Sequence, residues 1–177
     1  MRVAERTDIP ALTTLIVRSA RELSRDFYTP QETESAIRFV FGVDSALVSD
    51  GTYFVAEIDG ALAGCGGWSR RRTLYGGDQR PMGPPQLLDP GVDAARIRAF
   101  FVSPDFARRG VGRTLYQHCA RAAANAGFRA LELMATLPGV PFYSTLGFRE
   151  VEAVADTLPD GVVLRFVRMR REIGEVP

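Results

Sequence analysis

The chain has 177 residues, 46% of them hydrophobic and 24% charged, with a formal net charge of +1. This length and composition predict one soluble globular domain, residues 1–177, with a sizeable core. No segment approaches the roughly 20 apolar residues of a membrane span. The near-zero net charge argues against nucleic acid as a partner.

The chain contains two cysteines, Cys65 and Cys119. Two are too few for the disulfide framework of a secreted domain, so we expect both to be free thiols in a reducing compartment. The first 16 residues lack an apolar core of signal-peptide length. Together these features predict a cytoplasmic protein.

Hydrophobic periodicity in the first 69 residues predicts two helices between short strands. Thr7 or Asp8 can cap the first helix, and Pro30 fits the start of the second. Asp59 and Gly60 form a hairpin turn signal. In chain order we expect a strand at 2–6, helices at 11–24 and 31–42, and strands at 52–58 and 61–69.

Residues 70–93 lose this periodicity and contain four prolines and four glycines, so we expect a long loop of the kind that is often functional. The later elements are a strand at 94–102, a helix at 110–126, a strand at 130–136, a short helix from 138 to 147, and strands at 148–154 and 162–172. This order predicts an α/β (α+β) fold, a mixed sheet with helices on its faces.

Two glycines, Gly110 and Gly112, lie where a predicted strand is followed by a helix, with Arg108, Arg109 and Arg113 around them. A helix begins with unpaired N–H groups and a partial positive charge, and glycine lets a phosphate approach them. Neither a Walker loop nor a dinucleotide fingerprint fits the spacing. The pattern predicts a pyrophosphate cradle; the alternative is a tight turn with solvated arginines.

Two motifs resemble those of the GNAT superfamily of N-acetyltransferases. The segment VSPDFARRGVG, residues 102–112, resembles the acyl-CoA signature of a strand ending in Val-x-Pro and then Arg/Gln-x-x-Gly-x-Gly/Ala. The segment PFYSTLGF, residues 141–148, resembles the family's Phe-Tyr-x-x-x-Gly-Phe motif. The element order fits along nearly the whole chain. The resemblance implies a GNAT-like acyl-CoA N-acyltransferase fold, its mixed sheet of about six or seven strands splayed at the centre, with helices on both faces.

Two positions depart from the family pattern. Ala107 replaces the usual Arg or Gln of the cradle motif, which leaves Arg108 or Arg109 to compensate. Thr136 replaces an Asn upstream of the Phe-Tyr pair, and its hydroxyl can still hydrogen-bond with less reach.

The resemblance implies that acetyl-CoA, as co-substrate, lies between strands 96–102 and 130–135 and that an amine attacks its thioester directly. Tyr143 occupies the position of the family's usual acid, and a phenol is protonated at neutral pH; the alternative is a core aromatic. The implied cofactor-binding residues are Phe100, Phe101, Val102, Arg108, Arg109, Gly110, Val111, Gly112, Arg113 and Thr136.

The base that deprotonates the amine is not evident, because the strand ARIRAFFV, residues 95–102, holds no carboxylate. Glu57, Asp93 and Glu132 are the nearest carboxylates in sequence, and a water relay is an equal alternative. His118, the only histidine, is more simply a solvated helix residue, and Cys65 a buried structural thiol. No ligand spacing indicates a metal site.

The acceptor side is expected to involve the first two helices and the loops near the open end of the sheet. Arginines there would favour an acceptor with an anionic group, whereas a solvated hairpin edge and a core tryptophan are the plainer interpretations. The candidates are Tyr28, Trp68, Arg70, Arg71, Arg72, Tyr75, Asp78, Arg96 and Arg98.

These features predict an acetyl-CoA-dependent N-acetyltransferase acting on a small-molecule or peptide amine. A non-catalytic acyl-CoA-binding or regulatory module on the same fold is the alternative. A nucleic-acid binder that uses the arginine clusters is a third hypothesis, which the net charge disfavours. A homodimer is common in the family, although no pattern in this sequence indicates one.

Overall fold

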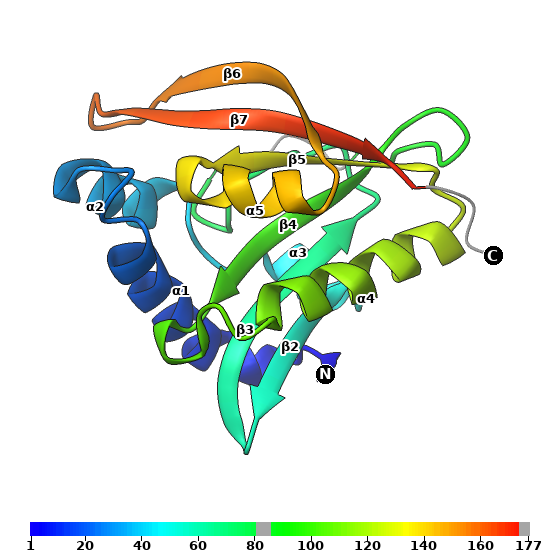
Figure 1. Ribbon diagram of the computed structural model, residues 1–177, viewed down its shortest axis with the longest axis horizontal. Helices are drawn as coiled ribbons and strands as arrows, with labels where there is room; N and C mark the ends of the chain where they lie inside the picture. The colour runs from blue at the N-terminus through cyan, green and yellow to red at the C-terminus, as the bar shows by residue number, and fades with distance from the viewer. Residues whose placement is uncertain (81–85, 174–177) are drawn as a thin grey trace.

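The computed structural model describes residues 1–80 and 86–173. Its strands form one sheet of seven, ordered β1-β2-β3-β4-β5-β7-β6, with helices on both faces (Figure 1). All neighbouring strands are antiparallel except β4 and β5, which are parallel. The strands are β1 (Arg2–Val3), β2 (Tyr53–Ile58), β3 (Ala61–Ser69), β4 (Ala95–Val102), β5 (Ala130–Thr136), β6 (Arg149–Thr157) and β7 (Val163–Glu172).

The helices begin at the residues that the sequence signals indicate. Thr29 caps the second helix: its hydroxyl accepts the Glu32 N–H at 3.2 Å, while the Glu32 carboxylate accepts the Thr29 N–H at 2.8 Å. The helices are α1 (Ile9–Leu23), α2 (Pro30–Phe39), α3 (Ser45–Ser49), α4 (Val111–Asn125) and α5 (Val140–Thr145), with 3₁₀ turns η1 (Arg6–Asp8), η2 (Pro104–Phe106) and η3 (Leu137–Gly139).

Each face of the sheet has its own hydrophobic core, because strand side chains alternate between the two faces. On one face, α4 and α5 cover a core that includes Leu115, Leu131 and Leu133. On the other face, α1, α2 and α3 cover a core that includes Ile16 and Leu164. The central strands β3, β4 and β5 are therefore covered on both sides and give rigid support to residues at their ends.

The predicted fold class and element order are confirmed, with local differences. Asp59 and Gly60 have positive φ angles of 51° and 77°, which suits the two-residue hairpin turn between β2 and β3. The first strand is shorter than predicted. The helix α3 was not predicted; the Asp44 carboxylate accepts from the N–H groups of Ala46 and Leu47 and so caps its single turn.

The predicted loop at 70–93 is partly ordered by its own pairing. The N–H of Arg72 donates to the carbonyl of Gln86 at 2.9 Å, and that of Leu88 to the carbonyl of Arg70 at 2.8 Å. Residues 81–85 of this predicted loop lie outside the described residues. Within the described part of the chain, no helix is both long and apolar enough to cross a bilayer.

Candidate active site at the divergence of β4 and β5

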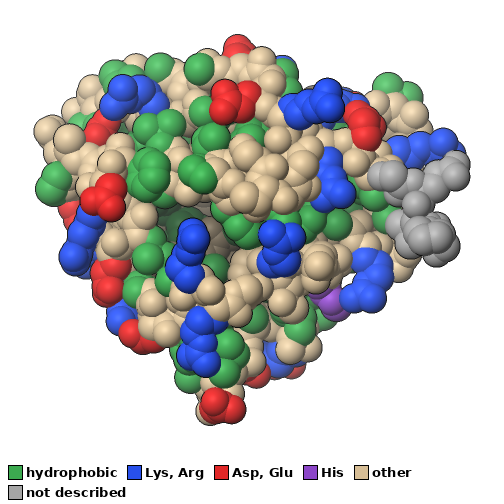
Figure 2. Space-filling model, viewed as in Figure 1, with side chains coloured by type: hydrophobic (Ala, Val, Ile, Leu, Met, Phe, Trp, Pro, Cys, Tyr) green, Lys and Arg blue, Asp and Glu red, His purple; other side chains and the backbone are tan. Residues whose placement is uncertain are grey.

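The two parallel strands separate along their length. Only two residue pairs are in register, Ala95 with Leu131 and Arg96 with Glu132, although β4 has eight residues and β5 has seven. Beyond these pairs the strands diverge toward Val102 and Thr136 (Figure 1). Figure 2 shows a hollow on this face of the molecule, left of centre, with basic side chains near it. The gap predicted between strands 96–102 and 130–135 is therefore present.

A bulge in β4 lies beside this gap. Cys65 of β3 pairs with Phe101 and Gly67 with Arg98, so β4 has one residue more than β3 between these pairs. Ala99, inside the bulge, has a φ of 52°, which is uncommon for a residue with a Cβ. Bulges of this kind re-aim the backbone beside functional sites.

Glycines in β3 make room for this arrangement. A Cβ atom on Gly64 would lie 2.9 Å from the Val111 side chain, one on Gly66 would lie 2.5 Å from the Phe100 ring, and one on Gly67 would lie 2.8 Å from the Tyr53 ring. Each glycine thus admits a side chain from a different neighbour, which is a known use of glycine within strands. The glycines of GCGGW are the signal for this close packing in the sequence, and they are not among the predicted site residues.

The loop after β4 has the geometry of an anion-binding turn. Gly110 caps α4 with a φ of 86°, and a Cβ there would meet no atom within 4 Å. Within the described residues, the N–H groups of Val111, Gly112 and Arg113 donate to no carbonyl or side chain. Unpaired N–H groups at a helix start are the donors that phosphate oxygens accept from.

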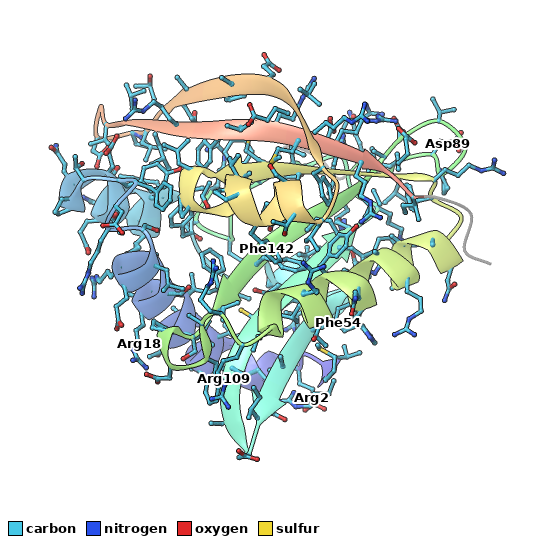
Figure 3. All side chains as sticks on the ribbon, in the orientation of Figure 1. Arg2, Arg18, Phe54, Asp89, Arg109 and Phe142 are labelled. Carbon is cyan, nitrogen blue, oxygen red and sulfur yellow. The ribbon has the colours of Figure 1, made fainter. Side chains whose placement is uncertain are left out.

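The arginines beside this turn are exposed, and Arg108 also has a positive φ of 63°. No ion pair in the described part of the chain uses Arg108, Arg109 or Arg113. The Arg109 guanidinium lies 5.3 Å from the centre of the Phe106 ring (Figure 3). These cations therefore lie around the turn without a carboxylate partner among the described residues.

The turn is held on both sides. From α1, Arg18 forms a bidentate ion pair with Asp105 of η2, with N–O distances of 2.6 and 2.8 Å. From α5, the Phe142 ring lies against Gly112, where a Cβ would approach to 3.2 Å (Figure 3). The start of α4 is therefore fixed relative to both α1 and α5.

Tyr143 is buried between aromatic neighbours, with ring centres 5.1 Å from Phe142 and 5.6 Å from Phe148. Among the described residues, its hydroxyl has no hydrogen-bond partner. Desolvation raises the pKa of Tyr143 well above its ordinary value near 10. A Cβ on Gly139 would lie 3.2 Å from both the Tyr143 ring and the Thr136 hydroxyl, so these two residues flank the same glycine.

Tyr28, a predicted acceptor-side residue, is buried where β7 meets the end of β5. Its hydroxyl donates to the carbonyl of Arg165 at 2.6 Å and accepts the N–H of Leu137 at 2.9 Å. Burial raises the pKa of Tyr28 to about 12. With both bonds made to backbone, the hydroxyl joins two elements of the fold.

The two arginines of β4 are each paired with a carboxylate. Arg96 bonds to Glu132, and Arg98 donates to Asp44 at 2.8 Å. Arg98 is only 3% exposed, and it also donates to the carbonyls of Thr73 and Gly76 at 2.8 and 2.6 Å. Arg98 therefore fastens the following loop to the sheet and presents no free cation to a ligand.

The arginines of the 70–72 segment differ from one another. Arg71 is bidentate to Asp50 at 2.7 Å, Arg72 lies 4.0 Å from Asp93, and Arg70 is exposed. The Asp78 carboxylate accepts from the N–H and hydroxyl of Ser45, which ties its loop to α3. Most of this predicted anion site is thus already neutralised or structural.

The predicted aromatic residues of the acceptor side lie on opposite faces of the sheet. Trp68 is in the core under α4, with its ring 5.9 Å from that of Phe128. Tyr75 packs on Phe166 on the other face, and its hydroxyl contacts Asp156 at 3.0 Å. The structure gives Trp68 a packing role, whereas Tyr75 remains near the divergent strands.

The carboxylates considered as a base lie far from the divergence. Glu132 bonds to Arg96 where the strands still pair, and Asp93 precedes β4, about 30 Å of extended chain from its other end. Glu57 pairs with Arg2 on β2. His118 packs edge-on to Phe54, and both cysteines are buried. Among residues 1–80 and 86–173, no group of three or more His, Cys, Asp or Glu could hold a metal ion.

Comparisons with known proteins agree with this geometry. A model of the acetyltransferase (GNAT) family matches residues 17–148. No curated protein matches the sequence. A GCN5-related N-acetyltransferase from Rhodopseudomonas palustris is 20% identical, covers 97% of this chain and 94% of its own, and superposes with a TM-score of 0.71.

Two further solved structures of the same fold contain a ligand. PaiA N-acetyltransferase from Thermoplasma acidophilum, in complex with coenzyme A, is 14% identical over 97% of both chains, with a TM-score of 0.64. YncA from Salmonella typhimurium, with its cofactor acetyl-CoA, is 16% identical over 99% of this chain and 94% of its own, with a TM-score of 0.63.

Proposed function

This chain belongs to the GNAT family of acetyltransferases, and on that premise we propose that it transfers an acetyl group from acetyl-CoA to the nitrogen of a primary amine. The observation that carries the proposal is the juxtaposition of two features. The strands β4 and β5 diverge, and the helix start with unpaired N–H groups lies at the end of β4, beside that divergence. The divergence of the strands would take the thioester arm of acetyl-CoA, and the helix start would take its pyrophosphate.

In this proposal the N–H groups of Gly110, Val111, Gly112 and Arg113 bind the pyrophosphate, and the guanidinium groups of Arg108 and Arg109 add positive charge around it. The backbone of Phe100 to Val102, freed from regular pairing by the bulge and the divergence, bonds to the pantetheine arm and polarises the thioester carbonyl. Thr136 closes the opposite wall.

Acetyl-CoA supplies the activated acyl group, and the protein handles the protons. Tyr143 donates a proton to the departing sulfur, because its raised pKa keeps the phenol protonated at neutral pH. No carboxylate among the described candidates lies at the divergence, so we propose that water carries the proton away from the attacking amine. No covalent enzyme intermediate is required.

We propose that the acceptor is an amine. Arg96 and Arg98 give no reason to expect an anionic group on it, because both guanidinium groups are already paired with carboxylates of the protein. Arg70 and Tyr75 remain as candidates for acceptor contact. Trp68 is left out, since it packs in the core under α4. Two buried free cysteines favour a reducing cytoplasm.

The first test is a thermal shift with acetyl-CoA, CoA and ATP at matched concentrations. A ligand present at about 100 times its dissociation constant adds roughly 2.7 kcal/mol of stability. We expect a shift with both CoA species and none with ATP. Absence of a shift with either CoA species would contradict the proposal.

The cradle is tested by comparing Gly110→Ala with Gly127→Ala. These glycines lie at the two ends of α4 with similar φ angles, 86° and 91°, so an added Cβ strains both backbones alike. We expect both variants to lose similar stability and only Gly110→Ala to weaken acetyl-CoA binding, by about tenfold or more. Equal affinities in the two variants would remove the cradle from the proposal.

Catalysis is separated from mere acyl-CoA binding by incubating the protein with acetyl-CoA and a panel of amines. All 22 basic side chains are arginines, so no lysine of the chain competes as an acceptor. Release of free CoA together with an acetylated amine supports the transferase. Tight binding without turnover across the panel would favour the non-catalytic module.

A further inference from the structure

A cavity lies between α4, α5 and the end of β7. Its volume is about 440 Å³. The residues from α4 recur at helical spacing, so they form one face of that helix. The cavity is lined by Arg113, Tyr116, Gln117, Ala120, Thr145, Leu146, Arg171 and Ile173.

Two cations face this cavity, and no carboxylate of residues 1–80 and 86–173 does. Arg113 comes from the first turn of α4 and Arg171 from β7, far apart in sequence. No ion pair within residues 1–80 and 86–173 involves either guanidinium. By contrast, Arg71, Arg96 and Arg98 are each paired with Asp or Glu. Two unpaired arginines converging on one cavity indicate a site for an anion.

The Arg171 side chain is held in place by contacts with other residues of the protein. Its Nη1 donates to the Tyr116 hydroxyl at 2.6 Å, and its guanidinium lies 5.7 Å from the centre of the Tyr116 ring. Gly147, which has a φ of 85°, borders the same side chain: a Cβ there would lie 3.6 Å from the Arg171 Nε. Tyr116 is itself buried and packs edge-on to Phe148, so it is a rigid support.

The remaining lining suits a group that is polar at one end and flat and apolar at the other. Gln117 and Thr145 supply neutral hydrogen-bonding groups. Leu146, Ala120 and Ile173 supply an apolar floor. A ligand that carries a phosphate beside an aromatic base would match this lining, with the phosphate near the polar groups and the base on the apolar floor.

Arg113 contributes both to the cradle at the start of α4 and to the lining of this cavity. The backbone N–H of Arg113 belongs to the unpaired helix start, whereas its side chain lines the cavity. In coenzyme A, the ribose that follows the pyrophosphate carries a phosphomonoester on its 3′ oxygen, with close to two negative charges at neutral pH. We propose that Arg113 and Arg171 bind this 3′-phosphate and so select coenzyme A over its 3′-dephospho form; this rests on the proposed function.

The test compares the binding of CoA and 3′-dephospho-CoA by calorimetry, because the two ligands differ only in that phosphate. The wild-type protein is expected to bind CoA at least tenfold more tightly, which corresponds to about 1.4 kcal/mol. In Arg171→Gln this ratio falls toward one, through loss of CoA affinity with little change for dephospho-CoA. Arg113→Gln produces the same change in the ratio, and because Arg113 is exposed the variant is expected to fold normally.

Arg121→Gln is the matched control, since Arg121 is an exposed arginine of the same helix that does not line the cavity. It keeps the wild-type ratio. Tyr116→Phe removes the bond that holds Arg171 and lowers the ratio part of the way. Equal wild-type affinities for the two ligands, or a ratio that survives both cavity variants, would overturn the assignment while leaving the proposed function intact. Failure of the wild-type protein to bind either ligand would overturn both.

Discussion

The hydroxyl of Tyr53 on β2 reaches across β3 and donates a 2.9 Å hydrogen bond to the carbonyl of Ala99 in the bulge of β4. Gly67 lies beneath the ring, and any Cβ there would be 2.8 Å from it. A fully buried side chain two strands away therefore holds the residue whose φ is 52°. The bulge is a supported feature of the sheet.

Tyr53→Phe is expected to lower the free energy of unfolding by about 1–3 kcal/mol, because the Ala99 carbonyl loses its partner. Turnover should also fall, since the backbone beside the bulge is proposed to orient the thioester. Denaturant unfolding and steady-state kinetics measure the two effects. Tyr75→Phe is the control for the unfolding measurement alone, because its hydroxyl contacts Asp156 at a partly exposed site. A wild-type unfolding curve for Tyr53→Phe would contradict the bulge-holding role.

Tyr143→Phe should reduce kcat by about 10²–10⁴-fold, the usual contribution of general acid catalysis, with little change in affinity for acetyl-CoA. The ring remains, so its packing on Phe142 and Phe148 persists. Since burial raises the pKa of Tyr143, the wild-type rate should not decline below pH 10 through loss of this proton. An unaltered kcat in the variant would leave Tyr143 with a packing role alone.

Stability should fall steeply at alkaline pH, and Tyr28 should account for part of the slope. Burial raises the pKa of Tyr28 from 10.0 to about 12. Above pH 10 the unfolded chain releases this proton while the folded protein retains it, so the free energy of unfolding drops by about 2–3 kcal/mol between pH 10 and pH 12. Tyr28→Phe should show a shallower slope over that window, measured by urea unfolding. Parallel pH profiles for the two proteins would rule this contribution out.

Arg98→Met should lower the free energy of unfolding by about 3–5 kcal/mol, because it leaves the Asp44 carboxylate buried without its partner. The amides near Thr73 and Gly76 should exchange hydrogen faster, since their carbonyl anchors are lost. Arg70→Met, at an exposed position, should change stability by less than about 0.5 kcal/mol. Similar effects in both variants would mean that Arg98 does not fasten the loop.

Local patterns predicted the regular elements because each is specified within its own segment. The capping residues before α2 and the Asp59-Gly60 turn act on neighbours in sequence, so the helix start and the hairpin could be predicted. The helix α3 is a single turn, too short for a periodic signal. The bulge depends on the register between two strands; the glycines of β3 indicate a close approach there, but they do not indicate which residue of β4 is the extra one.

The roles of the charged residues in the site also depend on contacts that are distant in sequence. Arg96 and Arg98 are two residues apart on one strand, so they lie on the same face of it. Their carboxylate partners, however, lie 36 and 54 residues away in sequence. From the sequence they looked like ligand-binding cations, and the long-range ion pairs reverse that interpretation. Arg171 shows the opposite case: it lies in a run of charged residues at the end of β7, and only the fold brings it to the cavity beside α4.

Because Gly64, Gly66 and Gly67 lack side chains, the stretch of β3 before Trp68 buries little apolar surface of its own and loses more backbone entropy on ordering than its neighbours. It nevertheless lies between β2 and β4 in the sheet. Its order therefore comes from side chains that converge on it from α4, β4 and β2. In refolding, the amides of β3 should gain protection from exchange after those of α4, and the β2–β3 hairpin, despite its tight turn, should form late rather than act as the nucleus.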